Sequence, residues 1–415
     1  MASPTTSASE SMQQKQSTQQ SNKPKQPQHK HDRLITRDMA LVMLATFCFM
    51  SSNMLANPIV AGYAESLGAS GMLMGVVAGS MSFISLFCRP IAGNLSDRTS
   101  KRTLVAAGTV LYFAAGLLYY FADSPIMLIM ARVINGVGFA CCSVCLATWM
   151  SLLLPIRHMG AGMGLYGTMN ALAMAVGPAF GIRAQKYIGY RLTFLSSLVL
   201  AAIMLIATLM VKNGGQPVRK KQTSISATKK HRFSIRSILE PRVVPLSLTF
   251  MMFAIAYFAN QSFIVSYVQS RHLPVSSDLF FMFYAVALLV LRLGLRDLFD
   301  SKGFRFWLTV CSLGMLAMLA CMTFLFNDWM LLLAAIFTAV GYGLMSSVTQ
   351  AQAVVIAGRE RSGIANSTYY AGIDLGMSVG PFVGGLVYGH LPAVWFYPVF
   401  MLAMPVAWLI YLLCV

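Results

Sequence analysis

The segment GNLSDRTSKR at positions 93–102 carries three cations and one acid, Asp97, and it stands between two long apolar stretches. Apolar stretches of about 20 residues are long enough to cross a bilayer as helices. An altered copy, RDLFDSKGFR, occupies positions 296–305, and its Asp300 follows Asp97 by 203 residues. The repeated charged turn between spanning stretches predicts an all-α membrane protein made of two similar halves.

The offset of 203 residues recurs along most of the chain. It relates Arg89 to Arg292, and it relates the pair Gly177–Pro178 to the pair Gly380–Pro381. One unbroken offset across so many positions indicates two parallel repeats, a pattern typical of transporters. We expect a six-helix bundle in each half, with the substrate path between them. The predicted division is a disordered tail, a first bundle, a basic linker and a second bundle, at 1–38, 39–211, 212–242 and 243–415.

The composition supports a membrane environment. Hydrophobic residues make up 57% of the chain and charged residues only 11%, whereas soluble domains average about 25% charged residues. Charge this scarce does not cover the surface of a water-soluble globule. Twelve apolar stretches are predicted to span the membrane, at 39–63, 70–91, 103–122, 126–150, 161–182, 192–211, 243–268, 277–295, 304–325, 329–354, 363–387 and 393–414.

The cations orient the chain in the membrane. The formal net charge is +18, from 31 Lys and Arg against 13 Asp and Glu. If the N-terminal tail is cytoplasmic, 26 of the 31 cations fall on the cytoplasmic side and four on the outer side. This bias matches the positive-inside rule and argues against a nucleic-acid partner. It predicts a multi-pass protein of the cytoplasmic membrane with both termini in the cytoplasm.

The segment 93–102 resembles the G-x-L-a-D-r-x-G-r-k signature of the major facilitator superfamily. Ser100 replaces the second glycine of that signature. The resemblance implies twelve transmembrane helices, and it implies that Asp97 latches the two halves together on the cytoplasmic side in one state. The simpler alternative is a short basic turn with an incidental acid. The matching residues are Gly93, Asp97, Arg98, Lys101 and Arg102.

Two further segments point to the drug–proton antiporter branch of that family. Arg132 opens a segment that looks like R-x-x-x-G-x-G, and residues 376–385 fit G-x-x-x-G-P-x-x-G-G. In those relatives the second pattern stands in helix 5, where this chain has the weaker copy around Gly177 and Pro178. The resemblance implies that this helix pair, with Gly380 and Pro381, controls closure. The alternatives are plain helix packing for the glycines and an outward-snorkelling side chain for Arg132.

Few polar side chains lie inside the predicted spans. Asp374 is the one acid well inside a span, and intramembrane acids commonly carry protons. We expect it to take and release the coupled proton or to bind a cationic substrate; the alternative is a carboxylate that accepts hydrogen bonds from bent backbone. Four amides at matching places of the two halves are expected to line a shared cavity or to join helices: Asn53, Asn57, Asn260 and Gln261.

The sequence therefore predicts a secondary transporter that exports small organic molecules by alternating access, in exchange for protons. The main alternative is an importer or facilitator of a sugar or another metabolite, and a third is a membrane sensor. No metal site is expected, because Cys141, Cys142 and Cys145 lack a complementary ligand cluster. No catalytic triad suggests an enzyme, and no cofactor is expected. The expected partners are the substrate, protons and the lipid bilayer, and the chain is expected to be a monomer.

Overall fold

The computed structural model describes residues 36–154, 159–216, 239–295, 298, 302–358 and 362–414. Within these ranges the chain is helical with short connections. The helices are α2 (Arg37–Ser66), α3 (Gly71–Arg98), α4 (Lys101–Phe121), α5 (Pro125–Leu153), α6 (Met159–Met210), α7 (Val244–Ser270), α8 (Ser277–Gly294), α10 (Phe304–Thr323), α11 (Asp328–Thr338), η3 (Ala339–Leu344), α12 (Met345–Ala357), α13 (Ser362–His390), η5 (Ala393–Trp395), α14 (Phe396–Met401) and α15 (Ala403–Cys414).

Capping side chains explain why several helices begin where they do. Ser70 and Ser124 accept hydrogen bonds from the backbone N–H groups of Leu73 and Met127, and they cap α3 and α5. The amide oxygen of Asn327 caps α11 in the same way, 2.9 Å from Met330 N. Such caps satisfy N–H groups that the first helical turn leaves unpaired. Links of a few residues therefore suffice to reverse the chain.

Ten helical segments of the described residues are long and apolar enough to cross a membrane. The predicted spans 161–182 and 192–211 both fall on α6, whose helical run is interrupted at Gly189 with φ 78° and ψ 172°. This positive φ is easy for glycine and strained for other residues. The predicted span 277–295 corresponds to α8, which has 18 residues and is not among the ten. The length and composition of these helices therefore agree with a multi-pass membrane protein, while the count of twelve spans stays a prediction.

The helices have a linker end and an opposite end. At the linker end, α2 begins and α6 ends, and the carboxylate of Asp38 accepts hydrogen bonds from the backbone N–H groups of Lys212 and Asn213. At the opposite end, α2 ends and α3 begins. Residues 217–238, which form most of the predicted linker, and the predicted tail up to residue 35 lie outside the described residues.

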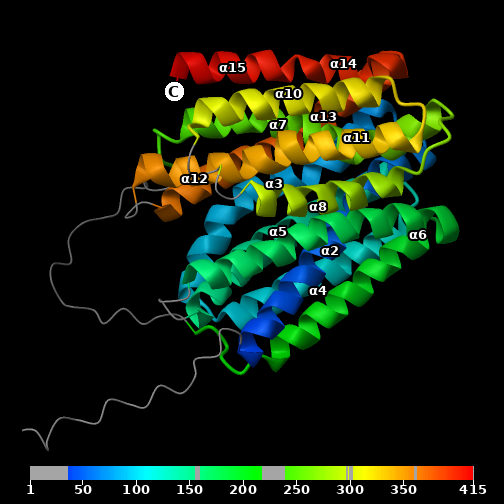
Figure 1. The fold of residues 1–415 in the computed structure, drawn as a ribbon. Coiled ribbons are helices and arrows are strands. Elements are labelled where there is room, and N and C mark those ends of the chain that lie inside the picture. The colour runs from blue at the N-terminus through cyan, green and yellow to red at the C-terminus, as the bar shows by residue number, and fades with distance from the viewer. Residues whose placement is uncertain are drawn as a thin grey trace, which may run out of the picture. The chain divides into compact units, whose positions relative to one another are not determined.

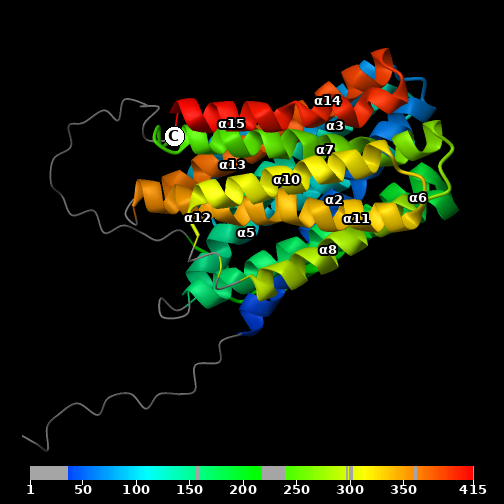
Figure 2. The same cartoon turned by 45° about the horizontal axis from the view of Figure 1, so that its top comes forward.

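The helices run alongside one another, as two views show (Figures 1 and 2). Within residues 37–210, α2 packs along α6, and α5 packs against α3 and α4. Within residues 244–414, α7 packs against α13 and α15, and α11 against α8 and α10. Contacts between these two sets join α3 to α13, α6 to α8 and α2 to α7. These three helix contacts, α3–α13, α6–α8 and α2–α7, are the seams between the two halves.

The seam between α3 and α13 is tight at the opposite end because glycines line it. A Cβ added to Gly75 would lie 2.5 Å from the carbonyl oxygen of Pro381, and one added to Gly71 would lie 2.5 Å from Cα of Gly389. Gly385 faces the backbone of Gly71 and Gly75. Small residues at such positions let membrane helices approach with their backbones in contact. This end of the seam therefore has no room for a side chain.

Candidate functional site

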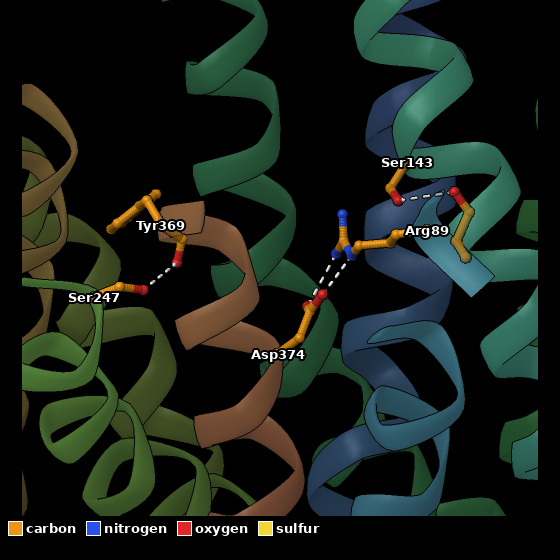
Figure 3. A network of polar contacts seen from close by, with 6 residues as sticks. Arg89, Ser143, Ser247, Tyr369 and Asp374 are labelled. Carbon is orange, nitrogen blue, oxygen red and sulfur yellow. Dashed lines mark hydrogen bonds and ion pairs between the residues drawn. The ribbon is translucent and has the colours of Figure 1, made fainter. Parts of the chain in front are cut away.

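An ion pair joins the two halves along the same seam, closer to the linker end. The guanidinium of Arg89 on α3 donates a hydrogen bond of 3.0 Å from Nη2 to Oδ1 of Asp374 on α13, and its Nε lies against the other carboxylate oxygen. Figure 3 shows the two side chains pointing toward each other from separate helices. The predicted proton candidate therefore has a cationic partner, not the bent backbone of the alternative.

The ion pair between Arg89 and Asp374 is largely buried. The side chain of Asp374 is 2% exposed and that of Arg89 is 23% exposed. The Arg89 guanidinium also lies 5.5 Å from the ring centroid of Phe139 on α5. Ionisable groups inside a membrane are costly and are usually paired. If the carboxylate took up a proton, the charge attraction that holds α3 to α13 would disappear.

A cleft opens between the halves at the linker end, beside the α6–α8 seam. Its volume is about 670 Å³. One wall is the first part of α6, including Gly167 and Thr168, and the other is formed by α8, α12 and α13. The lining residues are Met163, Gly167, Thr168, Arg292, Ser347, Gln350, Ala351, Val354 and Asn366. The cleft is open to its surroundings rather than enclosed.

Arg292 is the cationic residue of this lining. Its Nε atom is buried and has no hydrogen-bond partner within the described parts of the chain. The guanidinium interacts electrostatically with Tyr284, Tyr342 and Tyr369. Tyr342 stands in the π-helical turn η3 and stacks on Tyr257 with ring centroids 4.0 Å apart. The cleft lining therefore has one cation, Arg292, and these tyrosine rings lie buried behind it.

The opposite end holds the halves together by polar contacts as well as by glycines. The hydroxyl of Tyr388 on α13 donates to Glu65 at the end of α2, at 3.1 Å. Arg183 on α6 lies 3.8 Å from the carboxylate of Asp278 on α8. The structure thus has a cleft at the linker end while its halves are in contact at the opposite end.

Arg132 is a buried anchor within the first half. It is 2% exposed, and its guanidinium donates to Oδ1 of Asn57 at 3.1 and 3.2 Å. It also donates to the carbonyl oxygens of Val77 and Ala78 on α3. The side chain does not snorkel outward, and it does not line the cleft. It ties α5 to α2 and α3 and uses one of the four predicted amides to do so.

The other three predicted amides lie in the core between the halves rather than in the cleft. Gln261 on α7 places its Nε2 3.9 Å from the sulfur of Met54 on α2, and Asn260 accepts a 2.9 Å hydrogen bond from Tyr397. Among the described residues, both amide atoms of Asn53 lack a hydrogen-bond partner, as does Oε1 of Gln261. Buried polar atoms without partners are uncommon, so this core suits a polar ligand or water.

The charged turn 93–102 contacts the start of the linker. Lys101 donates to the carbonyl oxygen of Ser96, and Arg102 donates to the carbonyl oxygens of Val211 and Lys212. Arg98 is exposed, and Gly93 has open space around it. The side chain of Asp97 lies outside what the structure describes, so the predicted latch stays a prediction. The described cations of the turn bind within their own half.

The two Gly–Pro pairs pack helices inside each half. A Cβ on Gly177 would lie 2.9 Å from the carbonyl oxygen of Ser51, and one on Gly380 would lie 2.5 Å from that of Ile255. The pairs therefore seat α6 on α2 and α13 on α7, with Pro178 and Pro381 inside the helices. This arrangement agrees with the helix-packing alternative and leaves the role in closure as a prediction.

Sequence reasoning missed the partner of Asp374. Arg89 entered that reasoning through its repeat relation to Arg292 and as one of the cytoplasmic cations, whereas the structure places Arg89 within α3 against the other half. A usable signal was present, because Arg89 precedes Pro90 inside the helical stretch and not in the turn. A cation inside a span needs a partner, and Asp374 was the available acid.

The comparisons with known proteins agree with this fold. The family model of the Major Facilitator Superfamily matches residues 42–327 and 303–415, and the chain belongs to this superfamily. An uncharacterized MFS-type transporter of Methanocaldococcus jannaschii is 24% identical over 371 residues, covering 86% of this chain and 92% of that protein. The synaptic vesicular amine transporter of Homo sapiens is 26% identical over 172 residues, 41% of this chain and 33% of that protein.

Solved transporter structures share the fold. A nucleoside transporter superposes with a TM-score of 0.73 at 14% sequence identity, covering 91% of this chain and 99% of that one. A POT family transporter in complex with a thioalcohol-conjugated peptide gives a TM-score of 0.72 at 13% identity, covering 91% and 95%. At identities this low, the superpositions show the fold alone. The substrate has to be argued from the site.

Proposed function

We propose that this member of the major facilitator superfamily is a secondary active transporter that exports small organic molecules in exchange for protons. The proposal rests above all on the buried ion pair between Asp374 and Arg89, which joins the halves along the α3–α13 seam. The cleft at the linker end and the contacts at the opposite end support alternating access. Transport then requires the cleft to close and the opposite end to open.

Protonation of Asp374 is the proposed coupling step. A charged carboxylate holds Arg89 and keeps α3 against α13 at the linker end. A neutral carboxyl group gives up most of that attraction, so the linker end can widen while Arg89 turns toward the water of the cleft side. Because Arg89 already occupies both carboxylate oxygens, a proton role is favoured over direct binding of a cationic substrate.

The proposed architecture has twelve spans in two repeats, divided at 39–211 and 243–415. The contacts between the halves support it, because the offset of 203 residues carries the α3–α13 seam onto the α8–α6 seam and α2 onto α7. An axis along the membrane normal relates parallel repeats of this kind. The cation distribution favours cytoplasmic termini. We propose a monomer in the cytoplasmic membrane whose linker end is cytoplasmic.

The test has two stages. A growth-inhibition panel of chemically varied toxic compounds, with and without expression, identifies an exported compound. Purified protein in vesicles with an imposed pH gradient then reports proton flux with that compound present. We expect compound-dependent proton flux that Asp374→Asn removes, with the same amount of folded protein. Passive equilibration of the compound would contradict the proposal and favour a facilitator. Full proton-driven transport by Asp374→Asn would contradict the role of Asp374 in coupling.

A further inference from the structure

The two outer seams between the halves are equivalent in the repeat but differ in charge. The offset that carries Arg89 onto Arg292 also carries Ala171 onto Asp374. The α3–α13 seam therefore has both a cation and an acid, and the α6–α8 seam has the cation with alanine in place of the acid. The second seam is the one beside the cleft, because Arg292 lines that cleft.

Among the described residues Arg292 has no counter-ion, whereas its equivalent Arg89 pairs with Asp374. Ion pairs between described residues join Arg89 to Asp374, Arg183 to Asp278 and Arg191 to Asp123, and none includes Arg292. Its Nε atom is buried without a hydrogen-bond partner among those residues. A guanidinium has five donors in a planar fork that fits carboxylates and phosphates. The cleft thus presents an unfilled anion-binding group.

Ala171 lies on the wall that faces this group. Gly167 and Thr168 of α6 line the cleft, and Ala171 follows them by four and three residues, so it occupies the same helix face one turn further along. Polar groups that can accept or donate around an anion are present on the opposite wall, in Gln350 and Asn366, which hydrogen-bond to each other at 3.1 Å.

We propose that an anionic group of the substrate, a carboxylate or a phosphate, binds Arg292 in the cleft and takes the place that Asp374 has in the first seam and that Ala171 leaves without an acid in the second. The inference rests on the proposed transport function and narrows its substrate class to organic anions. Binding would join α6 to α8 through the substrate, as Asp374 joins α13 to α3.

Binding is testable without knowledge of the natural substrate. The reporter is Val354→Cys in the cleft lining, whose alkylation rate in the purified protein is followed by mass spectrometry of its own peptide. Benzoate and phenyl phosphate are the anionic probes, and benzamide and benzylamine are the neutral and cationic controls. We expect both anions to slow alkylation about tenfold, the size of a partly buried charge pair, and Arg292→Gln to abolish that slowing. No slowing by either anion, or equal slowing by benzamide, overturns the proposal.

A second arm supplies the missing acid in the chain itself. Ala171→Asp should slow alkylation of the same reporter about tenfold without any added probe, because it pairs with Arg292 across the cleft. Ala171→Asn is the matched control of equal size and should alkylate at the parent rate. Adding Arg292→Gln to Ala171→Asp should restore the parent rate. Equal rates for the Asp and Asn variants would contradict the proposal.

These measurements need neither a pH gradient nor transport. Loss of proton flux with intact protection by the anions would remove the antiport proposal and keep the anion site. Proton-driven transport with no protection by the anions would keep the antiport proposal and remove the anion site.

Discussion

The α3–α13 seam and the α6–α8 seam occupy equivalent places in the two halves, yet they behave differently in this structure. The first is closed by glycine contacts at the opposite end and by the Arg89–Asp374 pair toward the linker end. The second borders a cleft and carries Arg292 with no described acid against it. The repeat therefore preserves the scaffold. Asp374 supplies the acid that pairs with the cation of the first seam. The equivalent position of the second seam has no acid, and in our proposal a ligand takes its place.

The largest expected effect comes from removing the acid of the closed seam. Asp374→Asn should reduce proton-driven transport at least tenfold, because the charge that pairs with Arg89 no longer changes with protonation. Vesicle transport of an identified substrate under a pH gradient measures this effect. Asp374→Glu is the matched control and should keep part of the activity. Equal loss in both variants would mean that shape, not ionisation, matters at this position.

Overpacking the glycine contacts tests whether the closed seam depends on backbone proximity. Gly75→Val should destabilise the protein by about 1–3 kcal/mol, because its side chain meets the backbone of Pro381 and Gly385. Thermal unfolding in detergent measures the change. The control is Gly93→Ala, where nothing lies within 4 Å of an added Cβ. A stability loss at Gly93 as large as that at Gly75 would show that packing at the seam is not the cause.

A substitution of Arg132 tests the packing within the first half independently of the seams between the halves. Arg132→Met should cost about 1–3 kcal/mol of stability, since it leaves Asn57 and two α3 carbonyl groups without their donor. Because Arg132 contacts neither the cleft nor Asp374, the variant that remains folded should retain pH-dependent transport. Loss of the pH dependence at normal stability would place Arg132 in the coupling path instead.

The smallest effect is expected at the exposed contact of the second seam. Arg183 is 69% exposed and lies 3.8 Å from Asp278, and exposed pairs contribute about 0–1 kcal/mol. Arg183→Gln should therefore leave unfolding temperature and transport rate nearly unchanged. A several-fold change in transport would show that this contact controls opening at the opposite end.

Particular residues show how far the sequence carried the prediction. The offset of 203 residues indicated the repeat, and the scarcity of acids singled out Asp374, because both are patterns of residue type along the chain. The partner Arg89 was missed because it stands 285 residues away and no local pattern records which spans become neighbours. The role of Arg132 was equally open, since hydrogen bonds to Asn57 and to α3 carbonyls depend on how three helices pack.

The most direct test of the proton-controlled seam is a distance measurement between spin labels at Asn94→Cys on α3 and Ser367→Cys on α13, with the eight native cysteines replaced. Both positions are exposed. The ion-pair account predicts a short distance at high pH, a longer one at low pH, and the longer one at every pH in Asp374→Asn. A distance that ignores pH in the parent chain, or that still follows pH in Asp374→Asn, would contradict it.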